Sequence, residues 1–213
     1  MRRLALLIVM LATPAMAEDA PVLDQGAAAV PGAVALYLQA RGLAGLGQHR
    51  KDPLMVLTAA RILHGLRLTD TPRQPDPAHD PMPVVAPDAA ALLEVARQLD
   101  AGENYADLTD MLAREVPPHP HALRATASIL AAGASHTWTL PFFGGTFAEL
   151  AILGDGTSNL DLLVTGAGDT QICEDRGSAD RAYCGFVLRE NGDVTITVSN
   201  AGQTAGTYLL LTE

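Results

Sequence analysis

Acidic and amide side chains gather in one turn of the C-terminal half of the sequence. Asp155, Asn159 and Asp161 lie within the segment DGTSNLD. A second acidic cluster follows at Glu174, Asp175 and Asp180. Ca²⁺ prefers roughly six to eight oxygen ligands from carboxylates, amides and backbone carbonyls. The candidate calcium ligands are therefore Asp155, Asn159, Asp161 and Asp175. The alternative is that Asp155 and Asn159 hydrogen-bond their own turn and that Asp161 faces solvent.

Three histidines offer a second route to a metal site. His119 and His121 are separated by a single proline, and alternate residues of an extended segment point to opposite faces. A zinc or copper site would need both of them together with His136. A surface turn that leads into a helix is the simpler interpretation.

The sequence lacks the short motifs of the common enzyme classes. It contains no G-x-S-x-G, no H-E-x-x-H, no P-loop and no G-x-G-x-x-G after a strand. The sequence has one tryptophan, Trp138, four Tyr and four Phe. These are few aromatic side chains from which to build a sugar-binding cleft. We therefore expect no catalytic residues and no enzyme. A small hydrolase that uses the acidic residues around Asp161 is the enzymatic alternative.

The N-terminus has the pattern of a secretory signal peptide. Arg2 and Arg3 precede an apolar run over residues 4–12, and Ala15-Met16-Ala17 forms a cleavage site. The run is too short to span a bilayer. We expect cleavage after Ala17, no membrane span afterwards, and a periplasmic or secreted mature chain.

An exported chain reaches an oxidising compartment, and this decides the chemistry of its two cysteines. Cys173 and Cys184 are the only cysteines in the sequence, and their spacing is not that of a redox C-x-x-C motif. We expect a disulfide between them. Closing a loop of about 12 residues should add roughly 3 kcal/mol of stability.

The charge balance excludes one large class of partners. The chain has 24 acidic and 14 basic residues, a net charge of −10. Cleavage after Ala17 would remove two arginines and no acid, which gives −12. A nucleic-acid binder needs a basic surface, and none is present. Such a chain favours cationic partners or divalent metals.

Apolar spacing of three and four residues predicts a helical domain over residues 18–135. The expected helices cover residues 34–47, a segment that begins at Asp52-Pro53, 87–101, 105–115 and 121–132. A Pro-rich insert over residues 69–87 contains six prolines. Because proline removes a backbone donor and fixes φ, this insert should be an extended surface connection. A ligand for an aromatic groove is the alternative.

From His136 the pattern alternates with a period of two, which predicts strands. Seven short strands are expected over residues 137–140, 146–153, 160–165, 170–173, 182–188, 194–199 and 207–212. Gly- and Asp-rich turns separate them, so an antiparallel β-sandwich follows, with Trp138 in its core. The fold class is therefore α+β multidomain: an all-α N-terminal unit followed by a β-sandwich over residues 136–213.

Residues 136–213 also carry a family resemblance. The segments AELAI and GDG over residues 148–156, NLDLLV over 159–164, GDVTITVSN over 192–200 and GTYLL over 206–210 are similar to the bacterial pre-peptidase C-terminal domain. The resemblance implies a jelly-roll-like sandwich that is not catalytic and accompanies secreted hydrolases and other exported proteins. Some members of this family bind calcium or extracellular polymers.

These patterns together predict a binding or assembly role in the bacterial envelope. The partner would be an envelope or extracellular protein or polymer that the helical unit receives in a groove. Two alternatives remain open: an accessory module for a secreted hydrolase, and calcium-dependent adhesion to an extracellular polymer. Calcium is the one cofactor that the sequence suggests.

Overall fold

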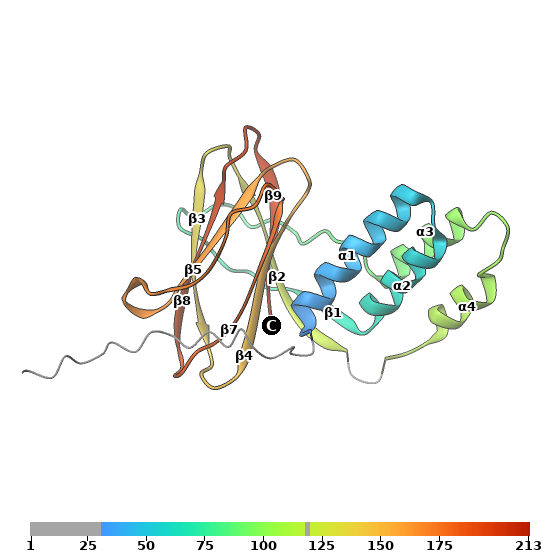
Figure 1. The fold of residues 1–213 in the computed structure, drawn as a ribbon, viewed down its shortest axis with the longest axis horizontal. Coiled ribbons are helices and arrows are strands. Elements are labelled where there is room, and N and C mark those ends of the chain that lie inside the picture. The colour runs from blue at the N-terminus through green and yellow to red at the C-terminus, as the bar shows by residue number, and fades with distance from the viewer. Residues whose placement is uncertain (1–30, 118–119) are drawn as a thin grey trace, which may run out of the picture.

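The protein combines a layer of helices with a sandwich of two β-sheets (Figure 1). The computed structural model describes residues 31–117 and 120–213. The helices are α1 (Ala33–Arg50), α2 (Pro53–His64), α3 (Ala89–Leu99) and α4 (Ala106–Arg114), with a 3-10 turn η1 (Ala167–Asp169). The strands are β1 (Leu66–Asp70), β2 (His121–Leu130), β3 (Ser135–Phe142), β4 (Phe147–Gly154), β5 (Leu160–Thr165), β6 (Gln171–Asp175), β7 (Arg181–Val187), β8 (Gly192–Asn200) and β9 (Gly206–Thr212). The predicted signal peptide, residues 1–17, and His119 lie outside the described residues.

In the described part of the chain, nine strands form two sheets. One sheet has the order β1-β2-β9-β4-β7 and the other the order β3-β8-β5-β6. Every pair is antiparallel except β1 with β2. The expected α+β class with a β-sandwich is confirmed, and each of the seven predicted strands is present. Trp138 is fully buried between the sheets, as predicted.

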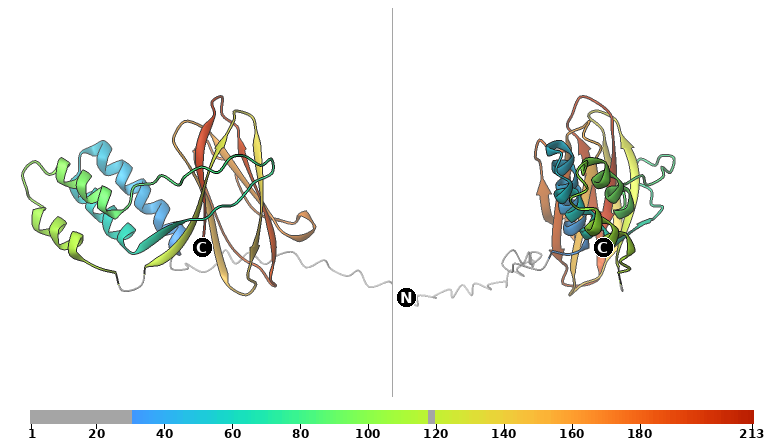
Figure 2. Two further views of the ribbon diagram at one scale, coloured as in Figure 1. Left: turned by 180° about the vertical axis from the view of Figure 1, so that it is seen from behind. Right: turned by 90° about the vertical axis from the view of Figure 1, so that its right-hand side faces the viewer.

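The helices lie beside the outer face of the five-stranded sheet, where α1 contacts β2 and β4 and α2 contacts β1 (Figure 2). Successive side chains of a strand point to opposite faces, so Leu150 and Leu210 enter the core between the sheets, whereas Ala151 and Leu211 pack against the helices. The five-stranded sheet is therefore buried on both sides where the helices lie. Its inner and outer faces belong to two apolar clusters.

The predicted helix over residues 121–132 is wrong, because this segment is strand β2. Its outward residues Leu123 and Ala125 pack under the helices, and its inward residues Thr126 and Ser128 are buried as well. A strand buried on both faces loses the polar–apolar alternation that identifies it. Strand β1 was not predicted either. The change from helices to strands thus begins before residue 136.

The Pro-rich segment crosses one open side of the sandwich, and we call residues 71–87 the strap (Figure 2). Asp76 exchanges two backbone hydrogen bonds of 2.8 Å with Thr137 of β3. Arg73 donates to Thr126 of β2 at 2.8 Å. Because β2 and β3 belong to different sheets, the strap closes the gap between them. It is extended, as predicted, but it is packed on the sandwich.

The opposite side of the sandwich is closed by a covalent bond. Cys173 of β6 and Cys184 of β7 form the predicted disulfide, with 6.2 Å between their Cα atoms. Strands β6 and β7 are the edge strands of the two sheets. In the described part of the chain no helix is both long and apolar enough to cross a bilayer.

Candidate functional site

In the acidic turn after β4, the Asp155 carboxylate accepts hydrogen bonds from nearby residues of the protein. Asp155 accepts from the backbone N–H and hydroxyl of Thr157, at 3.0 and 2.6 Å, and from those of Thr207 in β9, at 2.8 and 2.7 Å. Partial burial acts to raise the pKa of Asp155, but these hydrogen bonds outweigh it and hold the pKa well below its usual range. Asp155 therefore fastens the β4–β5 turn to β9.

The other three predicted calcium ligands, Asn159, Asp161 and Asp175, each lie in different surroundings. The Asn159 side-chain amide, in the orientation that satisfies its surroundings, donates to the carbonyls of Gly177 and Ala179 at 2.8 and 3.1 Å. Asp161 lies in the middle of the sandwich's second sheet opposite Ser199 of β8, and Asp175 ends β6. Within residues 31–117 and 120–213, no three His, Cys, Asp or Glu side chains are grouped to hold a metal. Calcium binding by Asp155, Asn159, Asp161 and Asp175 stays a prediction from the sequence.

His136 belongs to a buried polar cluster rather than to a group with His121. Its Nδ1 lies 3.1 Å from the Ser128 hydroxyl and 3.0 Å from the Tyr208 hydroxyl. Trp138 donates to Tyr208 at 3.0 Å, and His79 of the strap places its Nε2 2.5 Å from Ser128. Burial lowers the pKa of His136, and the neighbouring His79 adds to this. Burial raises the pKa of Tyr208 to about 12.

The Ser128–His79 pair has the spacing of a nucleophile and its base, with His79 Nδ1 held 2.6 Å from the Asp80 carbonyl. Ser128 is, however, 0% exposed, because the strap covers it. A substrate cannot reach a hydroxyl in that position. The cluster joins the strap to strands β2, β3 and β9, and we assign it a structural role.

Helix α1 is fixed on the sheet by two carboxylates, one in β4 and one directly after β9. Glu149 of β4 accepts from the backbone N–H groups of Gly32 and Val34 at 3.2 and 3.1 Å, and from the Tyr183 hydroxyl at 2.6 Å. Glu213 accepts from the N–H of Ala33 at 2.9 Å. These N–H groups have no partner inside the helix, so the carboxylates cap it and suit its dipole. The contact fixes where the later turns of α1 lie.

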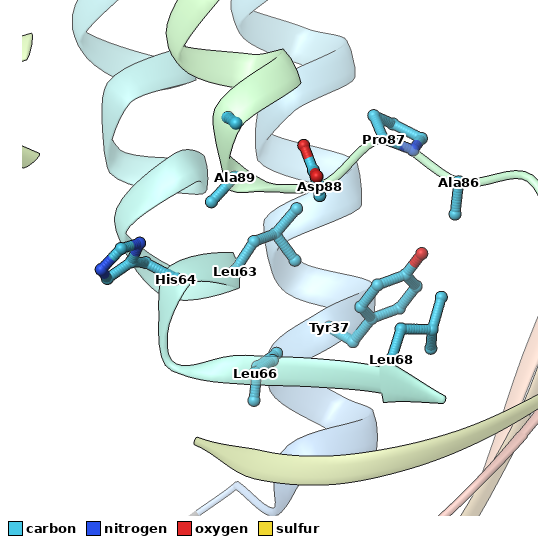
Figure 3. Close-up of a pocket in the computed structure, with 10 residues that line it drawn as sticks. Tyr37, Leu63, His64, Leu66, Leu68, Ala86, Pro87, Asp88 and Ala89 are labelled. Carbon is cyan, nitrogen blue, oxygen red and sulfur yellow. The ribbon is translucent and has the colours of Figure 1, made fainter. Parts of the chain in front are cut away.

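Tyr37, one turn further along α1, lines a cavity of about 200 Å³. The cavity, which we call the Tyr37 cavity, is lined mainly by Tyr37, Leu63, Leu66, Leu68, Ala86 and Pro87. Figure 3 shows the Tyr37 ring beside Leu68, with its hydroxyl directed toward Ala86 and Pro87 of the strap. Tyr37 is 3% exposed, and its hydroxyl has no hydrogen-bond partner among the described residues.

Arg41 follows Tyr37 by four residues and lines a larger groove of about 480 Å³. The groove, which we call the Arg41 groove, lies against the outer face of the five-stranded sheet and is lined mainly by Arg41, Met82, Val85, Ala127, Leu153 and Leu209. The Nη1 atom of Arg41 is buried and, in the described part of the chain, has no hydrogen-bond partner. Burial raises the pKa of Tyr37, and the neighbouring Arg41 opposes that rise only in part, through its positive charge and its N–H donors.

The Tyr37 cavity and the Arg41 groove together form what we call the α1 cleft. Both are lined by successive turns of α1 and by consecutive residues of the strap. Buried polar groups nearly always have partners. In the described residues four buried side-chain atoms lack one: Arg73 Nη2 and Ser158 Oγ lie elsewhere, and the Tyr37 hydroxyl and Arg41 Nη1 both belong to the α1 cleft. Concave apolar surfaces with a few convergent polar groups are the usual form of small-molecule sites.

No protein-family model and no curated protein matches the sequence. Solved structures with a similar fold include the pre-peptidase C-terminal domain of collagenase from Bacillus anthracis, at 14% identity and a TM-score of 0.35, over 42% of this chain and 87% of that one. The family that residues 136–213 resemble is thus among them. PliG from Aeromonas hydrophila, a periplasmic inhibitor of g-type lysozyme, matches at 16% identity and a TM-score of 0.33, over 43% and 86%. These matches assign no ligand or activity to this chain.

Sequence reasoning missed the residues of the α1 cleft. A signal for two of them is present: Val34, Tyr37, Arg41 and Ala44 follow the spacing of three and four that marks one face of a helix. A tyrosine and an arginine on an otherwise apolar stripe are polar groups placed toward the interior. Their common environment depends on the strap, which no local pattern places there.

Proposed function

We propose that this is an exported, non-catalytic binding protein whose binding site is the α1 cleft. One observation carries the proposal: Tyr37 and Arg41 each present a buried donor without a partner among the described residues, and both line hollows with apolar walls. An unsatisfied buried donor costs about 1–3 kcal/mol. A ligand that supplies an acceptor and covers the apolar walls would remove that cost.

Binding accounts for the cleft better than catalysis does. Two titratable side chains, His64 and Asp88, also line the Tyr37 cavity. The His64 ring is engaged by the Glu115 carbonyl, and Asp88 caps α3 through the N–H of Ala91 at 2.8 Å. Each is used in a structural hydrogen bond. Neither is positioned as a base beside a nucleophile.

Features of the sequence and of the fold are consistent with a location outside the cytoplasm. The N-terminal signal pattern, the disulfide and the acidic composition support a periplasmic or secreted location. We infer that the sandwich, whose strand order corresponds to a jelly roll, provides one wall of the cleft and the helices the other. We propose that the binding role predicted from the sequence is carried out at this cleft. An accessory role beside a secreted hydrolase rests on the family resemblance alone.

Methyl NMR of the mature protein tests the proposal. An organic extract of the producing cells is titrated into protein labelled at leucine methyl groups. We expect shifts at Leu63 and Leu68 of the Tyr37 cavity and at Leu153 and Leu209 of the Arg41 groove. The substitution Ala86→Trp, which fills the Tyr37 cavity, should weaken the shifts there, and Ala131→Trp in the exposed β2–β3 turn should not. Shifts confined to other leucines, or none, would overturn the proposal.

A further inference from the structure

We infer that the α1 cleft recognises a carboxylate attached to an aliphatic chain, an inference that rests on the proposed function. The carboxylate would meet Arg41 and Tyr37, and the chain would lie along the Arg41 groove. The ligand class follows from three properties of the cleft: its donors, its local charge and its apolar walls.

The two polar groups of the cleft are hydrogen-bond donors and require an acceptor. A guanidinium offers only N–H donors, and a tyrosine hydroxyl can donate once. Arg41 and Tyr37 are four residues apart on α1, so they lie one above the other on the same face of the helix. A carboxylate has two oxygens that can accept from both at once. Charge-assisted hydrogen bonds of this kind are stronger than those to a neutral carbonyl.

The local charge at Arg41 is not neutralised by the protein. No acidic side chain of the described residues makes an ion pair or hydrogen bond with Arg41. Asp155 also lines the groove as an ionised carboxylate, but its oxygens are engaged by Thr157 and Thr207 and make no ion pair with Arg41. The net negative charge of the chain acts over long distances and is screened by salt, whereas a contact with a partly buried guanidinium is screened much less.

The walls of the Arg41 groove suit an extended aliphatic chain. Leu153 and Leu209 line it from the sheet, and Met82 and Val85 line it from the strap. Val85 is 84% exposed, so a chain that lies in the groove would remove apolar surface of both partners from water. Each buried methylene adds about 0.8 kcal/mol to such binding. The groove therefore favours a ligand with a tail over a short carboxylate such as acetate.

Isothermal titration calorimetry of the delipidated mature protein tests the ligand class. The probes are dodecanoate, dodecanol and dodecylammonium, each below its aggregation concentration, and a short peptide with leucine residues at a free C-terminus. We expect dodecanoate to bind about tenfold more tightly than dodecanol. Dodecylammonium should bind more weakly than either. Binding of the peptide in place of dodecanoate would support the carboxylate and identify a polypeptide terminus as its source.

Matched variants locate the carboxylate. Arg41→Met should reduce dodecanoate affinity about tenfold and leave dodecanol affinity unchanged, because it removes the charge and keeps an apolar stem. Arg41→Lys should restore part of the loss, and Tyr37→Phe should weaken dodecanoate a few-fold. Arg50→Met, on an exposed position of the same helix, is the control.

Two results would overturn the inference in distinguishable ways. In the first, dodecanoate, dodecanol and dodecylammonium bind with equal affinity, and Arg41→Met changes none of the three affinities. The α1 cleft would then bind apolar chains without discriminating between their charges, which overturns the inference and leaves the proposed function standing. No heat with any probe would exclude the aliphatic carboxylate, and the leucine methyl shifts with cell extract would then decide separately whether the α1 cleft binds anything.

Discussion

Glu149 is the residue on which the contact between the helices and the sandwich depends most directly. It is 1% exposed, yet both carboxylate oxygens have partners, two of them backbone N–H groups at the start of α1. Burial and the hydrogen bond to Glu149 raise the pKa of Tyr183, which therefore stays a donor across the physiological range. A Cβ atom at Gly32 would lie 2.1 Å from the Glu149 carboxylate, so any larger residue there would displace the carboxylate from its present position.

Removing this carboxylate should loosen α1. Glu149→Ala leaves the N–H groups of Gly32 and Val34 and the Tyr183 hydroxyl without their acceptor, and we expect a loss of about 2–3 kcal/mol in the free energy of unfolding. Urea denaturation followed by circular dichroism measures it. Glu190→Ala, at an exposed position, is the control. A cost for Glu149→Ala no larger than that of the control would contradict the assigned role.

His136 should make stability depend on pH. Burial keeps its pKa in the folded protein below the ordinary value of 6.5, and the groups that face it, His79, Ser128, Tyr208 and Trp138, include no acid to offset this. Above pH 6.5 the imidazole is neutral in both states. As the pH falls below 6.5, the unfolded chain binds a proton that the folded protein binds less readily, so stability is lost.

Thermal melts between pH 7.5 and pH 5 check this dependence. His136→Gln keeps a hydrogen-bonding side chain without a titration, so its Tm should fall less over this range than that of the parent protein. His121→Gln, on an exposed position of β2, should fall as the parent does. Parallel curves for the parent protein and His136→Gln would show that His136 does not control the dependence.

Calcium at the Asp155 turn is tested by melts in calcium and in EDTA. A ligand that binds only the folded state must raise Tm. Because the oxygens of Asp155 already accept four hydrogen bonds from the protein, we expect the two curves to coincide. A rise in Tm that Asp161→Asn abolishes would instead support the calcium site predicted from the sequence.

Local sequence signals predicted most strands of the sandwich, but they predicted a helix where strand β2 lies. Val194, Ile196 and Val198 alternate with polar residues because one face of β8 is buried and the other is only partly so. Asp52 and Pro53 marked the start of α2, and the Asp52 side chain does cap it through Leu54 and Met55. In β2 both faces are buried and alanine is frequent, so its composition resembles that of a helix.

The polar contacts of the strap could not be predicted in the same way. Its prolines exclude a helix, and that much the sequence shows. The partners of Arg73 and His79 lie about 50 residues away on β2. Such contacts depend on the tertiary fold, and no spacing within the strap reports them. The α1 cleft likewise depends on the position of the strap, so no local sequence pattern predicts it.

The disulfide should strengthen the side of the sandwich opposite the strap. Replacing both cysteines, Cys173→Ser with Cys184→Ser, removes the link between β6 and β7, and we expect a loss of about 2–3 kcal/mol because the loop it closes is short. Chemical denaturation of both proteins, with and without reductant, measures the loss. Reductant should destabilise the parent protein and leave the variant unchanged; equal stability of the two oxidised proteins would contradict the prediction.

At the scale of the whole molecule, the two apolar clusters share the five-stranded sheet, so the helices and the sandwich support one another. Residues 136–213 alone would lack β2, and the outward side chains Ala151 and Leu211 would lose their cover. We expect this fragment to lack a cooperative thermal transition and residues 31–213 to melt in a single one. Circular dichroism during heating checks both. A cooperative transition of the fragment would show that the sandwich folds without its helical layer.

The cap on α1 has a consequence for how the chain matures. Val34 and the Glu149 carboxylate that holds its N–H are 115 positions apart. A polypeptide leaves the ribosome with its N-terminus first, so the α1 segment emerges long before β4 exists to receive it. Until then α1 lacks the carboxylate that caps it and the sheet face that it contacts, although α2, which follows it directly, is already available to pack against it. The first turn of α1 therefore reaches its final position only after β4 has been synthesised.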